Sequence, residues 1–258
     1  MKLRSILLAT IAVAAFTGTA NAASVAALMG NDMVAVVDTT AKKVTKSMKV
    51  TGLSGALIGI DVRPADNMLY GVTDDGGVYT IAMDGKATKK STLDTMLAKG
   101  TVATVDFNPA ADRLRVMGAD GTNLRANVDD GKVTKDGSHK YADADMHKGE
   151  KPNIVAGAYT NSVKGTKTTT LYNIDATIGG LIKQAPPNDG MLNAVGKLGV
   201  KADTVAFDIW SDGSKNEAWL MVKDTLYSVD LDSGKATEAA KISGVSGAVR
   251  DIAILPAM

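Results

Sequence analysis

Short apolar runs recur along the chain at nearly regular intervals, and polar turns separate them. They are LIGIDV (57–62), VATVDF (102–107), IVAGAY (154–159), TVAFDI (204–209) and VRDIAIL (249–255). Between the runs, apolar and polar residues alternate in short segments that Asp-Gly and Gly-Gly pairs interrupt, as in ADNMLYGVTDDGGVYTIAMDGKAT (65–88). Alternation with tight turns predicts β-hairpins rather than helices.

The chain also repeats itself. When IDVRPADNML (60–69) is placed above VDFNPAADRL (105–114), Asp61 falls on Asp106, Pro64 on Pro109 and Leu69 on Leu114. A second marker, Lys-(Ala/Val)-Thr, occurs at 43–45, 86–88, 132–134 and 235–237. A divergent fifth copy is expected near residue 185. A period of about 45 residues with four short strands per unit is typical of β-propeller blades.

These repeats predict an all-β, five-bladed β-propeller in which each apolar run forms an innermost strand. The last run, 249–255, has no further strands after it, and the segment 24–50 supplies only three strands. We expect the C-terminal strand to complete the N-terminal blade, which removes two open sheet edges. A two-sheet sandwich with coincidental spacing is the alternative. Residues 23–258 would form a single domain.

The motifs resemble a known family. VDFNPAADRLRV and NLRANVDDG, then AGAYTNS and LIKQAPPNDGMLNAVGKLGV, are similar to an uncharacterised bacterial family described as domain of unknown function 4394. The resemblance covers essentially the whole chain after its first residues. It implies an exported, propeller-like bacterial protein and implies no reaction, ligand or catalytic residue.

The first residues have the features of a secretory signal peptide. Lys2 and Arg4 precede an apolar segment, residues 6–16, and Ala20-Asn21-Ala22 offers a cleavage site after residue 22. We therefore expect a periplasmic or secreted protein, and no second apolar run suggests a membrane anchor. Cleavage would change the formal net charge from +1 to −1. This near-neutral balance argues against nucleic-acid binding. The absence of cysteine excludes disulfides and thiolate metal sites.

One strand of the third unit carries an unusual arginine face. Arg113 and Arg115 alternate with apolar residues, and a three-residue turn would place Arg125 of the next strand opposite Arg115. Like charges that lie opposite each other are unfavourable unless an anion or a carboxylate lies between them.

Two interpretations of this face follow. In the first, Arg113, Arg115 and Arg125 bind a small anionic ligand, with Asn108 and Asn123 as neutral donors. In the second, which we favour, the arginines form ion pairs that lock one blade to the next, as buried arginines need partners. The candidate carboxylate partners nearby in the sequence are Asp112, Asp120 and Asp129.

Four of the five innermost runs carry an aspartate, and the fourth has Ala158 instead. The aspartates are Asp61, Asp106, Asp208 and Asp251. At one height around the axis, their oxygens would suit a hard cation, and Ca²⁺ is the candidate cofactor. The alternative, which we favour, is that each carboxylate accepts backbone N–H groups from the neighbouring blade.

Both histidines lie in the segment HKYADADMH (139–147) between the third and fourth units. His139, Asp143, Asp145 and His147 together offer two imidazoles and two carboxylates to a divalent metal. We expect this long polar connection to be exposed.

The leading functional hypothesis is an exported, non-enzymatic binding or scaffold protein whose partner is an unknown small molecule or protein. The ligand would lie at the axial channel or on the arginine face. One alternative is a glycoside hydrolase that uses two axial aspartates, and the other is a metal-dependent periplasmic protein. Hydrolysis requires two carboxyl groups about 5–9.5 Å apart across an open cleft.

Overall fold

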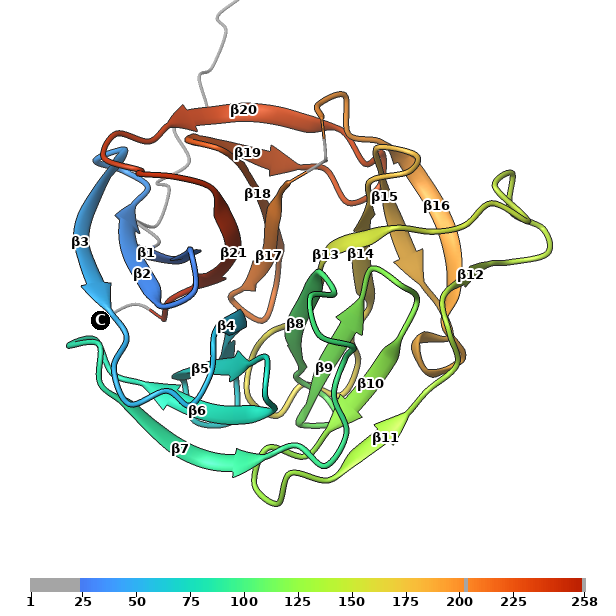
Figure 1. Ribbon diagram of the computed structural model, residues 1–258. Coiled ribbons are helices and arrows are strands. Elements are labelled where there is room, and N and C mark those ends of the chain that lie inside the picture. The colour runs from blue at the N-terminus through green and yellow to red at the C-terminus, as the bar shows by residue number, and fades with distance from the viewer. Residues whose placement is uncertain (1–23, 202–203, 257–258) are drawn as a thin grey trace, which may run out of the picture.

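The computed structural model describes residues 24–201 and 204–256, which form five small sheets arranged in a ring (Figure 1). The prediction of a five-bladed β-propeller is confirmed. The expected signal peptide, residues 1–22, lies outside the described residues. Across the described part of the chain, no helix has the length and apolar character needed to cross a lipid bilayer.

In the first blade, the last strand of the chain takes the innermost position. From the axis outward, the strands are β21 (Val249–Ile254), β1 (Ser24–Met29), β2 (Met33–Asp38) and β3 (Lys43–Lys49). Strands β21 and β1 are antiparallel, with Ala26 opposite Ala253. The predicted closure of the ring by the C-terminal strand is therefore confirmed.

The second, third and fifth blades each follow the chain outward from the axis through four strands. The second contains β4 (Leu57–Arg63), β5 (Met68–Thr73), β6 (Gly77–Ile81) and β7 (Ala87–Thr92). The third contains β8 (Ala103–Asn108), β9 (Arg113–Gly118), β10 (Asn123–Ala126) and β11 (Val133–Lys135). The fifth contains β17 (Ala206–Ser211), β18 (Asn216–Val222), β19 (Thr225–Val229) and β20 (Ala236–Lys241).

The fourth blade has an additional outer strand. Its first four strands are β13 (Ile154–Tyr159), β14 (Leu171–Asp175), β15 (Gly180–Gln184) and β16 (Met191–Lys197). A short strand from the preceding connection, β12 (Lys140–Tyr141), pairs in parallel with β16. The divergent repeat near residue 185 contains a single 3₁₀ turn, η1 (Pro187–Asp189).

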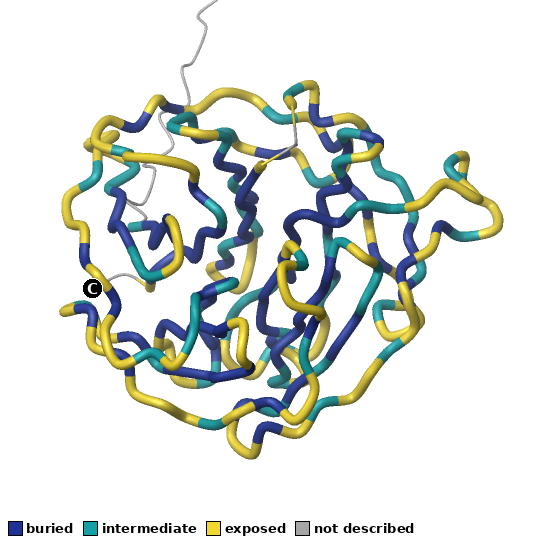
Figure 2. Tube along the Cα trace, in the orientation of Figure 1, coloured by how far each residue is buried: buried dark blue, intermediate teal, exposed yellow. Residues whose placement is uncertain are grey.

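Burial decreases from the axis to the rim of the ring (Figure 2). All six residues of the innermost strand β13 are buried, whereas most of the outermost strand β3 is exposed. The apolar core lies between neighbouring blades. For example, Tyr70 of the second blade meets Phe107 of the third edge to face, with ring centroids 5.2 Å apart. The alternation seen in the sequence thus produces sheets that pack on both faces.

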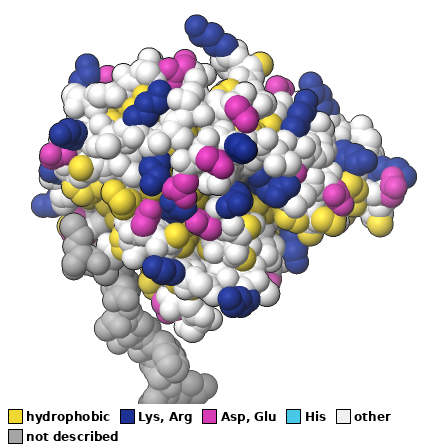
Figure 3. Space-filling view, turned by 90° about the horizontal axis from the view of Figure 1, so that it is seen from below, with side chains coloured by type: hydrophobic (Ala, Val, Ile, Leu, Met, Phe, Trp, Pro, Cys, Tyr) yellow, Lys and Arg dark blue, Asp and Glu magenta, His cyan; other side chains and the backbone are white. Residues whose placement is uncertain are grey.

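The face shown in Figure 3 carries basic and acidic side chains that are interspersed rather than separated by sign. This distribution agrees with the near-neutral formal charge of the chain. Mixed charges create no extended field of one sign on this face.

Candidate functional site

The axial aspartates connect the innermost strands of neighbouring blades. Each carboxylate accepts a backbone N–H from the next blade around the ring. The four bonds are Asp251 Oδ2 to Ile60 N at 2.9 Å, Asp61 Oδ2 to Phe107 N at 2.7 Å, Asp106 Oδ1 to Tyr159 N at 2.9 Å, and Asp208 Oδ2 to Ile254 N at 2.7 Å. The side chains therefore hold together strands that have no sheet pairing with each other.

Asp251 does not occupy the position equivalent to the other three aspartates. Asp61 bonds Phe107, which directly follows Asp106, the equivalent residue of the next blade. Asp106 likewise bonds Tyr159, which directly follows Ala158. Asp208 bonds Ile254, which makes Ala253 the equivalent residue in β21. Asp251 lies two residues earlier in the same strand. The expectation that all four carboxylates lie at one height is therefore wrong for Asp251, and only Asp61, Asp106 and Asp208 share one height.

The connection between the fourth and fifth blades uses other groups, because Ala158 has no carboxylate. Ser162 Oγ donates to the carbonyl oxygen of Ile209 at 3.2 Å. Asn161 and Asn216 bond each other twice: the backbone N–H of Asn161 donates to Asn216 Oδ1 at 2.7 Å, and Asn216 Nδ2 donates to Asn161 Oδ1 at 3.0 Å. This interface is thus closed at the ends of the strands rather than near their middle.

The three aspartates at one height converge on the axis. One carboxylate oxygen from each of Asp61, Asp106 and Asp208 lies within 4.8 Å of the others, and all three residues are buried. Burial raises the pKa of Asp61 and of Asp106 well above the ordinary value, and the neighbouring carboxylates raise both pKa values further. Burial raises the pKa of Asp208 to about 6. The cluster therefore favours either retained protons or a bound cation.

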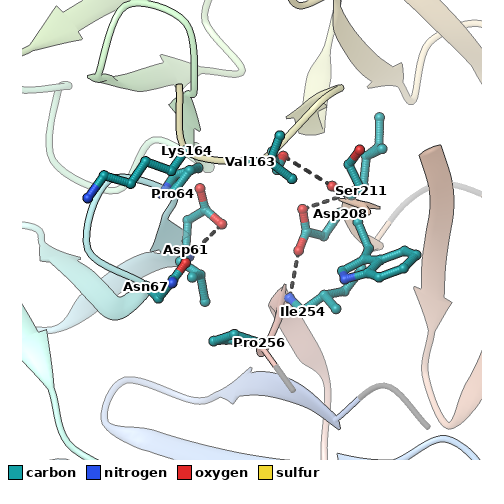
Figure 4. A pocket seen from close by; sticks show the side chains of 13 residues that line it. Asp61, Pro64, Asn67, Val163, Lys164, Asp208, Ser211, Ile254 and Pro256 are labelled. Carbon is teal, nitrogen blue, oxygen red and sulfur yellow. Dashed lines mark hydrogen bonds between the residues drawn. The ribbon is translucent and has the colours of Figure 1, made fainter. Parts of the chain in front are cut away.

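A cavity of about 350 Å³ opens over this cluster at the carboxyl ends of the innermost strands. Asp61 and Asp208 face each other across it, and Pro256 lies beside them (Figure 4). Trp210 also lines the cavity, and Lys215 Nζ lies 5.9 Å from the centroid of its ring. The cavity thus combines two acidic groups with an aromatic wall.

The arginine face of the third blade forms an internal ion-pair network. Arg115 and Arg125 lie opposite each other, as the turn length predicts, and Asp136 Oδ2 lies 2.6 Å from both Arg115 Nη1 and Arg125 Nε. Arg115 also donates to Tyr159 Oη at 3.1 Å and to Asn188 Oδ1 at 2.9 Å, both in the fourth blade. The guanidinium of Arg115, which is 1% exposed, thus joins two blades.

The sequence interpretation did not identify Asp136 as the partner of these arginines. Two of the three candidate carboxylates, Asp112 and Asp129, instead bond Arg63, which the sequence interpretation did not single out. The third, Asp120, accepts the backbone N–H of Thr122. The sequence signal that could have identified Arg63 is its position directly before Pro64, at the end of an innermost strand.

The remaining residues of the proposed anion site also bond within the chain. Arg113 Nη1 donates to the carbonyl oxygen of Asp112 at 2.9 Å. Asn108 Oδ1 accepts the backbone N–H groups of Ala110 and Ala111 in a local turn. Asn123 Oδ1 accepts a hydrogen bond from Arg115. Each of these side chains thus has at least one hydrogen-bond partner within the chain.

The histidine segment is divided between buried and surface positions. His139 is 7% exposed, in contrast to the expected exposure of this connection. Asp143 pairs with Lys148, Asp145 Oδ2 accepts the backbone N–H of Ala194, and His147 Nδ1 lies 3.1 Å from Glu150 Oε1. Within residues 24–201 and 204–256, the only convergent group with metal-ligand spacing is the axial one. The four residues of the histidine segment are not brought together.

Comparisons with known proteins found a matching family model and similar solved structures. The family model described as a domain of unknown function, DUF4394, matches residues 32–253. A solved protein of unknown function from Bacteroides thetaiotaomicron VPI-5482 is 16% identical with a TM-score of 0.55, and the match covers 92% of this chain and 65% of that one. A second, from Bacteroides caccae, is 12% identical with a TM-score of 0.46, covering 92% and 100%. No curated protein matches the chain.

Proposed function

Because the chain belongs to the family described as a domain of unknown function, DUF4394, we propose its function from the geometry of its own site. The protein is a non-enzymatic binding module, and its axial cavity takes a small hard cation such as Ca²⁺ or the cationic group of a small molecule. The sequence of residues 1–22 supports export to the periplasm or the cell exterior as the place where it acts.

The convergence of three buried carboxylates below a cavity carries this proposal. Their oxygens lie within 4.8 Å of one another, so full ionisation without a cation is unfavourable. Carboxylate oxygens are the ligands that Ca²⁺ prefers. Asp61 and Asp208 are accessible from the cavity, and Asp106 lies beside them in the cluster. An anionic ligand has less support, because Arg115 and Arg125 are already paired with Asp136.

Glycoside hydrolysis has less support than binding. Hydrolases need two carboxyl groups about 5–9.5 Å apart across an open cleft. In this protein the three carboxylates are buried and converge on one another rather than flanking an open cleft. Both oxygens of Asp208 also accept backbone N–H groups, from Ile209 and Ile254. These bonds fix the carboxylate in place, which suits the holding of a ligand.

A calcium titration at pH 8 tests the proposal. We expect the free energy of unfolding of the wild type to rise with CaCl₂, by about 2.7 kcal/mol when Ca²⁺ reaches a hundredfold excess over its Kd. Asp208→Asn should abolish the rise, because it removes a charged ligand. Asp212→Asn, a change in an exposed turn, is the matched control and should respond as the wild type does.

Parallel titrations with MgCl₂ and with ethanolammonium chloride distinguish a metal ion from an organic cation. If none of the three salts at millimolar concentration stabilises the wild type more than Asp208→Asn, the proposed function is wrong.

A further inference from the structure

The interface between the third and fourth blades contains polar groups that the chain leaves without partners. Within the described residues, four buried side-chain atoms have no hydrogen-bond partner: Thr104 Oγ1, Asn173 Oδ1 and both ring nitrogens of His139. Buried polar groups in native proteins are nearly always hydrogen-bonded, and an unmet group costs about 1–3 kcal/mol. The location of all four at one interface therefore requires an explanation.

Thr104 and Asn173 lie at the same level of the interface, on opposite blades. Asp106 bonds Tyr159 across the interface, and Thr104 precedes Asp106 by two residues on the same face of β8. Gly157 precedes Tyr159 by two residues on β13, so it lies level with Thr104. A Cβ on Gly157 would overlap Asn173 Oδ1, so this oxygen occupies the place of the missing side chain. Asn173 Oδ1 thus covers Gly157, and the strand positions place Thr104 at the same level on the facing strand.

His139 enters the same interface from the connection between the blades. Its backbone N–H donates to the carbonyl oxygen of Gly121, in the turn between β9 and β10. The charges of Arg115 and Asp120 from the third blade, and of Asp175 from the fourth, act on the pKa of its ring. Asp175 follows Asn173 by two residues on the same face of β14. The imidazole is therefore enclosed by the two blades.

We propose that this interface is an internal hydration site, in which buried water molecules bond Thr104 Oγ1, Asn173 Oδ1 and the imidazole of His139. The hydrogen-bonding needs of these unpaired groups determine which molecule can bind there. Asn173 Oδ1 requires a donor, whereas a neutral imidazole requires both a donor and an acceptor. Water satisfies both needs, and buried waters make about three such bonds. A cation is disfavoured by the neighbouring guanidinium of Arg115, and an anion by the carboxylates of Asp120 and Asp175.

The sign of the stability change in Thr104→Val tests this site. If the hydroxyl bonds a water molecule, its loss should raise the unfolding equilibrium constant about fivefold, the usual effect of removing one hydrogen bond. If the interface is dry, the same change removes an unpaired hydroxyl and should lower the constant. Thr73→Val sets the scale, because Thr73 Oγ1 bonds Asp75 Oδ1 and the carbonyl oxygen of Gly77.

Oxygen-17 magnetic relaxation dispersion provides a second measurement that counts long-lived internal water molecules directly. We expect fewer of them in Thr104→Val and in His139→Phe than in the wild type, and an unchanged number in Thr73→Val. An unchanged number in the first two variants, or stabilisation by Thr104→Val, would overturn the proposal.

Discussion

Asp136 Oδ2 lies 2.6 Å from Arg115 Nη1, and the two side chains are 5% and 1% exposed. The same oxygen lies 2.6 Å from Arg125 Nε, so one carboxylate bridges two opposed guanidinium groups. Arg115 in turn donates to Tyr159 and Asn188 of the fourth blade. A single acidic side chain thus supports the contact between two blades.

Asp136→Ala should therefore be strongly destabilising. Removal of one partner from a buried ion pair costs about 3–5 kcal/mol, because it leaves an uncompensated charge. Denaturant unfolding of the variant and the wild type measures the loss. Asp129→Ala is the control, since Asp129 is half-exposed and Arg63 retains Asp112. We expect the control to cost at most about 1 kcal/mol. Equal losses in both variants would contradict the assigned role of Asp136.

Asp208 should make stability fall as pH rises. Its pKa is about 6 in the folded protein, against 3.8 ordinarily, so between these values the folded state holds a proton that the unfolded state has lost. From pH 4 to pH 7, the wild type should lose about 2 kcal/mol relative to Asp208→Asn. Urea unfolding of both proteins across this range gives the difference, and a constant difference would refute the expectation.

His139 should have the opposite effect in nearly the same range. Burial lowers the pKa of His139 from 6.5 to about 4, and nearby Arg115 contributes to this lowering. Below pH 6.5 the unfolded state gains a proton that the folded state does not accept. The wild type should therefore lose about 3 kcal/mol relative to His139→Phe as pH falls from 6.5 to 4. The same urea series detects it, and His147→Phe serves as a control near the surface.

Gly59→Ala should destabilise the packing of the innermost strands around the axis. A Cβ at this position would lie 2.5 Å from Val105 Cγ2 and 2.9 Å from Asp251 Oδ2, the oxygen that bonds Ile60. Overpacking of this kind costs about 1–3 kcal/mol. Thermal melting compares it with Gly30→Asn, which changes a turn glycine at φ 59° with no atom within 4 Å of an added Cβ. A smaller effect for Gly59→Ala than for Gly30→Asn would show that the axis tolerates the methyl group.

A disulfide between β1 and β21 should stabilise the ring. Ala26 and Ala253 are directly paired, and the chain contains no other cysteine to interfere. In Ala26→Cys/Ala253→Cys, oxidation closes a loop that spans most of the protein, and stabilisation of up to about 4–5 kcal/mol is expected. Thermal melting with and without reductant measures it, and each single variant should show no difference. A lower midpoint after oxidation would indicate that the pair is too strained.

The sequence predicted the architecture well, because four of the five blades repeat the same alternation and the same turn marker. The register between strands was also accessible locally. The length of the turn between β9 and β10 places Arg115 opposite Arg125, as found. Both features depend on residues close together in the chain.

The sequence did not reveal contacts that depend on the path of the connections. Asp136 follows β11 in a polar segment, and nothing local indicates that it lies beneath two arginines. His139 has polar neighbours in sequence but lies between two blades. Asp251 appeared equivalent to Asp61 by residue type. A shift in the pairing of β21 with β1, near Leu28 and Met29, accompanies its different position.

The placement of β21 beside β1 has a consequence for how the protein is made. During synthesis, the first blade to leave the ribosome lacks the strand that must line its inner edge. That edge stays available for incorrect pairing until β21 has also been synthesised. The ring can therefore close only after the strands of all five blades have been synthesised, which gives any cellular factor that keeps chains unfolded a long interval in which to act.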